Sequence, residues 1–278
     1  MTQQIERLSY SGMTTWHQCG YKFWLHYIEG LPGDPPSEAT LVGTVVHEAL
    51  ESIFAPEATI QASLPEAAKR AWGNNQEAID ALGDVDIQSM KRNVLSSLSV
   101  LYSAWFGADV EGVEVEVRFD AKTPVGRTAS FLGLVDMVER VGHGLYVHDA
   151  KTGKIPDERS RWFDEQIEAK LDQPALYAYA LESQVGTEVE GYCLDYAHDG
   201  EFASFPGSRT DDAVRRFLVA WDQIMDAVEA ETPPKPAPGP LCGWCLYVTI
   251  CDAGRKEVEK RWALNKSVGP AKERLGLR

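Results

Sequence analysis

The chain has 278 residues, 44% of them hydrophobic and 25% charged, which is the composition of a globular protein large enough for one α/β domain with an accessory piece. Its formal net charge of −15 argues against broad nucleic-acid binding by bulk electrostatics. No apolar run reaches the length of about 18 residues that spans a membrane, and the N-terminus has no apolar signal region. We therefore expect a cytoplasmic protein with no membrane contact.

The charge is spread unevenly along the chain. Residues 253–278 contain eight Lys or Arg and three Glu, a net charge of +5, so the remainder carries about −20. Such a basic segment can contact phosphates, or it can be a solvated terminal helix, and the sequence leaves both interpretations open.

Helical patterns dominate the first hundred residues. Ser9 or Ser11 can cap a helix that begins near residue 12, and a loop rich in Pro and Gly follows at residues 31–40. Residues 43–54 have helical spacing of apolar positions, and residues 87–106 form the strongest amphipathic pattern of the region. We assign the latter helix to the scaffold or to a helical lid.

Strands are expected next. Residues 113–119 alternate between polar and apolar, which predicts a strand, and either of its acidic residues Glu114 and Glu116 can reach a nearby metal site. Residues 128–140 and 144–151 then predict two strands joined by a tight turn that contains Gly142 and Gly144.

This strand pair carries a candidate catalytic group. Asp149 and Lys151 point to one face because side chains alternate along a strand, and Ala150 points away. If the strands pair as a hairpin, Asp136 comes close to Asp149. Two carboxylates and a lysine are what a divalent metal and an activated water need, although an Asp-x-Lys pair is also common on solvated strand faces.

The helix after this hairpin adds two polar candidates. Residues 166–183 predict a helix with Pro174 in its first turn, where the missing N–H costs nothing. Gln173 and Tyr177 are four residues apart and so lie on one helix face. Residues 191–197 predict a strand parallel to 144–151, because a helix joins the two. A last core helix is expected at 211–230.

Three closely spaced cysteines follow a proline-rich linker at residues 231–240. Cys242, Cys245 and Cys251 need a fourth ligand to complete a tetrahedral or four-cysteine site. Cys193 lies in an apolar strand and is interpreted as a small buried hydrophobe, so Cys19 is the better candidate. Thiolates suit both zinc and an iron–sulfur cluster, and the residues alone leave this choice open.

Together these motifs resemble the PD-(D/E)XK nuclease superfamily, and within it the RecB-like exonucleases, including the CRISPR-adaptation nucleases and the AddB nuclease domain with their iron–sulfur clusters. The matching pieces are GTVVHEALE, GLVDMV, HDAKTGK, QPALY, and one cysteine upstream with three downstream. Each motif alone is weak evidence for the family, whereas all five in this order are specific to it.

The resemblance implies a role for each matching residue. Catalytic Mg²⁺ or Mn²⁺ would be bound by His47, Asp136, Asp149 and the carbonyl of Ala150. Lys151 would position or activate the attacking water, and Gln173 and Tyr177 would support the site or the DNA near it. A 4Fe–4S cluster, with Zn²⁺ as the alternative, would be held by Cys19, Cys242, Cys245 and Cys251.

The resemblance also implies the architecture. We expect an α/β fold with a central mixed sheet flanked by helices, a helical N-terminal part, and an iron–sulfur module that joins the two termini. Residues 1–110 would hold the cluster cysteine, the histidine helix and a helical insertion. Residues 111–230 would form the nuclease core, and residues 231–278 the linker, cysteine module and basic tail.

The function implied is that of a metal-dependent DNA exonuclease, acting on single-stranded ends in recombination, repair or CRISPR-adaptation processing, in a phage or CRISPR setting. The alternative is a low-activity accessory or DNA-binding subunit of a recombination or adaptation complex. A zinc-stapled structural protein is a third hypothesis, but it leaves His47 and the Asp-x-Lys element unexplained.

Overall fold

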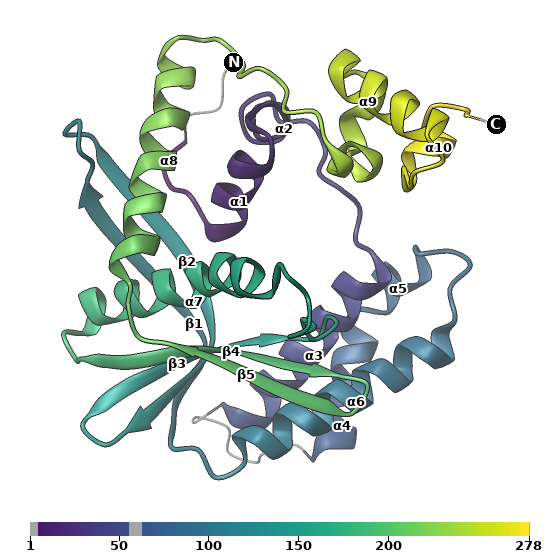
Figure 1. The fold of residues 1–278 in the computed structure, drawn as a ribbon. Helices are drawn as coiled ribbons and strands as arrows, with labels where there is room; N and C mark the ends of the chain where they lie inside the picture. The colour runs from purple at the N-terminus through teal and green to yellow at the C-terminus, as the bar shows by residue number, and fades with distance from the viewer. Residues whose placement is uncertain (1–4, 56–62, 278) are drawn as a thin grey trace. The chain divides into compact units, whose positions relative to one another are not determined.

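A mixed five-stranded sheet, in the order β1-β2-β3-β4-β5, organises the fold in a computed structural model that describes residues 5–55 and 63–277 (Figure 1). The expectation of an α/β protein with helices flanking a mixed sheet is confirmed. The strands are β1 (Val110–Lys122), β2 (Thr128–Val141), β3 (Gly144–Lys151), β4 (Val189–His198) and β5 (Glu201–Gly207).

The chain divides into two compact units. One comprises the residues up to 35, residues 120–131 and those from 215 onward, and the other comprises residues 36–119 and 132–214. No helix in the described ranges is long and apolar enough to cross a membrane.

The predicted hairpin is present as β2 and β3. The two strands pair antiparallel from Val141 opposite Gly144 to Met137 opposite His148. Gly142 forms the turn with φ of 59°, a left-handed conformation that a residue without Cβ adopts at little cost. The pairing brings the polar ends of the two strands, residues 136 and 149–151, to the same part of the sheet.

Strand β4 runs parallel to β3, as expected from the helix that joins them. The strand after it, β5, was not predicted. It pairs antiparallel with β4 through a tight turn at Asp199 and Gly200, which have φ values of 51° and 82°. Pro206 is accommodated because β5 is an edge strand.

Helices cover both faces of the sheet in the unit of residues 36–119 and 132–214. Helix α7 packs on one face of β3 and β4, and α6 packs on the opposite face, where α3 and α4 complete the layer (Figure 1). A core cluster lies between this layer and Met137, Ala150 and Ala197 of the sheet. The helices are α3 (Glu38–Phe54), α4 (Leu64–Asn74), α5 (Gln76–Asp80), α6 (Ile87–Trp105) and α7 (Phe163–Val185).

The position of Pro174 differs from the prediction. Helix α7 begins at Phe163, so Pro174 lies in the helix interior and the expectation of a first-turn proline is wrong. A proline there removes one helix hydrogen bond, at a cost of about 3 kcal/mol. Pro174 is buried, as are Ala175 and Leu176 beside it, so packing of the helix against the sheet offsets that cost.

The other unit contains the helices at the two ends of the described chain. Ser9 caps α1, because its Oγ accepts a hydrogen bond from the N–H of Gly12. A small separate core of Val248, Val258, Val268 and Ala271 holds the C-terminal segment together. The elements are α1 (Tyr10–Gln18), α2 (Gly20–Phe23), η1 (Trp24–Ile28), α8 (Asp211–Glu229), η2 (Pro240–Trp244), η3 (Leu246–Thr249), α9 (Asp252–Ala263) and α10 (Ala271–Arg274).

Candidate active site

The candidate residues of the strand pair line one cavity of about 480 Å³. It lies within a single compact unit and receives side chains from α3, β1, β2, β3 and α7. Its titratable lining residues are His47, Glu48, Glu51, Glu114, Asp136, Asp149, Lys151 and Tyr177.

Asp149 and Lys151 share a strand face, as predicted. Their side chains form an ion pair between Oδ2 and Nζ, while Ala150 points into the core on the other face of the sheet. Asp149 is only 1% exposed, and burial raises the pKa of its carboxyl to about 6 against the opposing effect of Lys151. Burial lowers the pKa of Lys151, but the carboxylates of Asp149 and Asp136 reverse this and raise it.

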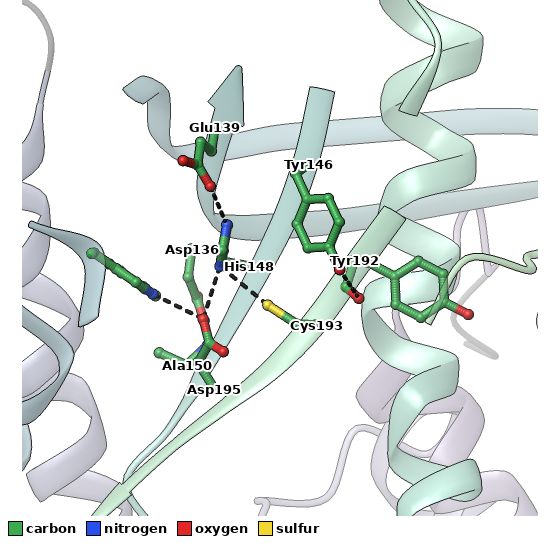
Figure 2. A network of polar contacts seen from close by, with 9 residues as sticks. Asp136, Glu139, Tyr146, His148, Ala150, Tyr192, Cys193 and Asp195 are labelled. Atoms are coloured by element: carbon green, nitrogen blue, oxygen red, sulfur yellow. Dashed lines mark hydrogen bonds and ion pairs between the residues drawn. The ribbon is translucent and has the colours of Figure 1, made fainter. Parts of the chain in front are cut away.

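Asp136 is fixed to the neighbouring strand by a backbone contact. The N–H of Ala150 donates a hydrogen bond to Oδ2 of Asp136 over 2.6 Å (Figure 2). The other carboxylate oxygen, Oδ1, lies 3.0 Å from Nδ1 of His47. One carboxylate therefore links β3 to helix α3 at the floor of the cavity.

His47 lies between two carboxylates. Its Nδ1 is 3.0 Å from Asp136 and 3.9 Å from Oε1 of Glu114. Burial disfavours the charged imidazole, but Asp136 outweighs this and the pKa of His47 rises to about 9. Burial and repulsion by Asp136 raise the pKa of Glu114 to about 7. The carboxyl of Glu114 and the imidazole of His47 thus hold protons that a cation would displace.

Gln173 and Tyr177 complete the site from α7. Nζ of Lys151 donates a hydrogen bond to Oε1 of Gln173 over 3.0 Å, and Nε2 of Gln173 donates to the hydroxyl of Tyr177 over 2.8 Å. This chain of hydrogen bonds orients the lysine. When the N–H₂ group of Gln173 donates to Tyr177, the amide oxygen of Gln173 is left to accept from Lys151.

The residues present fit a divalent cation. One ligand atom each from His47, Glu114 and Asp136 lies within 4.8 Å of the others. The buried Oδ2 of Asp149 touches Lys151 but has no hydrogen bond of good geometry among the described residues, so it retains acceptor capacity. Carboxylate oxygens with one imidazole are ligands that Mg²⁺ and Mn²⁺ accept.

The sequence matches the family model of the PD-(D/E)XK nuclease superfamily over residues 7–252. The chain belongs to this superfamily. In this PD-(D/E)XK nuclease, Asp136 and the series Asp149-Ala150-Lys151 follow the order that the family name describes, with Val135 in place of the proline. Nucleases of the superfamily use divalent metals, in agreement with the ligand atoms gathered here.

Among solved structures, the nuclease is similar to the crystal structure of SSO0001, with 14% identity and a TM-score of 0.39 over 88% of this chain and 95% of that one. No curated protein sequence matches this nuclease.

Helix α3 contributes more to the cavity of the nuclease than the single histidine predicted. Thr40, Thr44, His47 and Glu51 all line it. They are spaced by three or four residues, which places them on one helix face, and this polar stripe was the signal that could have identified Glu51 and the threonines. Glu48 lines the cavity too, but its Oε2 accepts a hydrogen bond from Asn75.

The four candidate cluster cysteines also lie together, in the other compact unit. Cys19, Cys242, Cys245 and Cys251 line one cavity of about 150 Å³. Among the described residues, no three of these thiols have their sulfur atoms within 4.8 Å of one another. Cys193 is buried elsewhere, as expected, although its sulfur contacts His148.

Proposed function

We propose that this PD-(D/E)XK nuclease is a metal-dependent DNA exonuclease that hydrolyses phosphodiester bonds at single-stranded ends. The observation that carries this proposal is the convergence of His47, Asp136, Asp149 and Lys151, which span about a hundred residues of sequence, on one open cavity. We also propose that the enzyme acts in recombination, repair or CRISPR-adaptation processing, and this part rests on the resemblance of its motifs.

The metal ligands in this proposal are His47, Asp136 and Asp149, together with the carbonyl of Ala150, and Glu114 joins them. Bound Mg²⁺ or Mn²⁺ supplies charge neutralisation at the phosphate and lowers the pKa of a coordinated water. The protein holds two of its acids in place beforehand, Asp136 by the N–H of Ala150 and Asp149 by Lys151. Little reorganisation is then needed when substrate arrives.

Lys151 acts on the attacking water. Its ammonium group stays charged because two carboxylates stabilise it, so it orients the water and the scissile phosphate by hydrogen bonding. Gln173 fixes the direction of the ammonium, and Tyr177 fixes the direction of Gln173. These two residues are positioning residues, because they act through the lysine.

The exposed cations of the C-terminal segment supply a surface for the DNA backbone. Arg255, Lys256, Lys260, Lys266 and Lys272 are exposed on and after helix α9. In a chain with a net charge of −15 this segment is the local exception, and phosphate contacts of this kind make binding weaken with salt.

Digestion of end-labelled DNA tests the proposal. Single- and double-stranded substrates are incubated with Mn²⁺ and either the wild type, Asp149→Ala or Lys151→Ala. We expect the wild type to shorten single strands from an end, and both variants to lose cleavage while they stay folded by circular dichroism. Equal activity of all three proteins would contradict the mechanism, and DNA binding without cleavage by the wild type would favour the accessory subunit instead.

We further propose that Cys19, Cys242, Cys245 and Cys251 hold a 4Fe–4S cluster. Four thiols face one cavity, and four cysteine thiolates are the ligand set of a 4Fe–4S cluster. The cluster would join residue 19 to residue 242 and so close a loop that spans most of the chain.

Anaerobically purified protein tests this second proposal. We expect a brown solution with absorbance near 400 nm (roughly the range of thiolate-to-iron charge transfer) and about four iron atoms per chain. Cys242→Ser is expected to lose the colour, whereas Cys193→Ser is expected to keep it. A colourless protein that contains one zinc ion per chain would overturn the cluster.

A further inference from the structure

A second group of potential metal ligands lies in the same unit as the cavity, on the other face of the sheet. His148 of β3 and Cys193 of β4 are register partners, and Asp195 follows two residues along β4. Because side chains alternate along a strand, His148 points away from the face of Asp149 and Lys151. Figure 2 shows the three side chains turned toward one another.

The distances within this group are short. Nδ1 of His148 lies 2.8 Å from Oδ2 of Asp195 and 3.1 Å from Sγ of Cys193. One nitrogen, one sulfur and one oxygen are therefore all within 4.8 Å of one another. An imidazole nitrogen, a thiol sulfur and a carboxylate oxygen are the atom types that bind zinc in proteins.

The surrounding residues hold each of the three side chains in place. Nε2 of His148 lies 3.0 Å from Oε2 of Glu139, so the imidazole can donate there and leave Nδ1 with a free lone pair. Nε1 of Trp105 donates to Asp195 over 2.8 Å. Ser204 hydrogen-bonds both Cys193 and Asp195 from β5. Cys193 and Asp195 are almost fully buried.

We propose that Nδ1 of His148, Sγ of Cys193 and Oδ2 of Asp195 bind one Zn²⁺ ion, and that Glu139 orients the histidine as its outer partner. A thiolate, an imidazole and a carboxylate suit zinc, and a histidine that donates its second N–H to a carboxylate is the usual arrangement around it. Binding releases the thiol proton of Cys193 to solvent. The ion links β3 to β4 directly behind Asp149 and stiffens the strand that carries it.

Co²⁺ is the probe for this site, because a cobalt–thiolate bond absorbs in the near ultraviolet. The full chain, with its four-cysteine site loaded and Mg²⁺ in excess, is titrated anaerobically with Co²⁺. The cavity of Asp136 and Asp149 has no thiol and contributes no such band. We expect one equivalent of Co²⁺ to give the band in the wild type, one equivalent of Zn²⁺ to remove it, and Cys193→Ser to lack it.

Two milder variants keep the proposal testable if Cys193→Ser does not fold. Glu139→Gln lies at the partly exposed end of the network and is expected to keep the band but to weaken Co²⁺ binding by about 10–100-fold. Tyr146→Phe is the matched control, because the Tyr146 ring contacts His148 while its hydroxyl bonds the carbonyl of Tyr192. The affinity of Tyr146→Phe for Co²⁺ is expected to equal that of the wild type. No thiolate band in the wild type, or equal affinities of Glu139→Gln and wild type, would overturn the zinc site.

Discussion

The ammonium nitrogen of Lys151 donates a hydrogen bond to the side-chain oxygen of Gln173, 3.0 Å away on helix α7. Gln173 in turn donates to Tyr177, one helix turn further on. This relation couples the Asp-x-Lys strand to the helix that covers it. The direction in which the lysine points is thereby set by two residues of another element, which line the same cavity as the proposed metal ligands.

Gln173→Met tests this coupling, because it keeps the length of the side chain and removes the acceptor. We expect cleavage to fall by about tenfold to 10²-fold, since an ångström of misplacement in an active site costs that much. Tyr177→Phe is expected to lower cleavage too, by a smaller factor than Gln173→Met. The double variant should lose less than the sum of the two free-energy effects, because both changes act on one lysine.

The matched control for this series is Gln166→Met, which changes an exposed glutamine of the same helix. It should leave cleavage unchanged. Cleavage rates measured at saturating DNA and Mn²⁺ report the positioning of Lys151, because substrate binding no longer limits them. Full activity of Gln173→Met would show that the lysine is oriented without the glutamine.

Asp149→Asn should separate stability from activity. Burial raises the pKa of Asp149 to about 6, so the folded state disfavours its charge, and a neutral side chain of equal size removes that cost. In EDTA we expect a melting temperature equal to that of the wild type or about 2–4 °C higher, as a gain of about 1 kcal/mol would give. Cleavage should fall to background.

Added Mn²⁺ supplies the control for Asp149→Asn. The wild type should gain melting temperature when Mn²⁺ binds its folded state, and the variant should gain much less because it lacks one ligand. Equal gains in both proteins would remove Asp149 from the metal site.

Metal binding should strengthen as the pH rises from about 6 to 9. In the metal-free protein the pKa of His47 is raised to about 9, that of Glu114 to about 7 and that of Asp149 to about 6. Each group must lose its proton before it can bind a cation, so affinity falls as the pH drops through each of these values. Each proton that the cation displaces changes the binding affinity by about tenfold per pH unit.

Mn²⁺ titrations at pH 6, 7.5 and 9 measure this slope. His47→Asn is the informative variant, because it removes the group with the highest pKa. It should bind Mn²⁺ more weakly and with a flatter dependence between pH 7.5 and 9. A wild-type affinity that does not change with pH would contradict the proton displacement.

Local sequence patterns predicted the elements of the fold where strands or helices carry a clear period. The hairpin of β2 and β3, the parallel strand β4 and helix α6 all follow from alternation or amphipathic spacing. Pro174 was misplaced because a local rule puts proline in a first turn, whereas the tertiary packing of α7 tolerates it inside. Strand β5 was missed although Asp199-Gly200 is a strong hairpin signal.

The site was accessible from sequence only in part. Spacing showed that Asp149 and Lys151 share a face, but nothing local places His47 3.0 Å from Asp136, since that distance depends on how α3 packs against the sheet. Glu114 was one of two candidates on its strand, and only the fold selects it. The group of His148, Cys193 and Asp195 depends on the pairing register of β3 with β4, which no single strand encodes.

Gly243→Ala should damage the cysteine module, because Gly243 lies between Cys242 and Cys245 where the chain passes close to Val268. A Cβ at this position would lie 2.7 Å from the backbone carbonyl carbon and oxygen of Val268, and backbone atoms cannot move aside as a side chain can. We expect a loss of about 1–3 kcal/mol in stability, as for other overpacked sites, together with reduced iron content. Gly239→Ala is the matched control, since it has extended backbone with φ of −171° and no atom within 4 Å of the added Cβ. Thermal melts and iron analysis of the two variants decide the matter: normal iron and stability in Gly243→Ala would mean that the close approach to Val268 does not hold the cysteines in place.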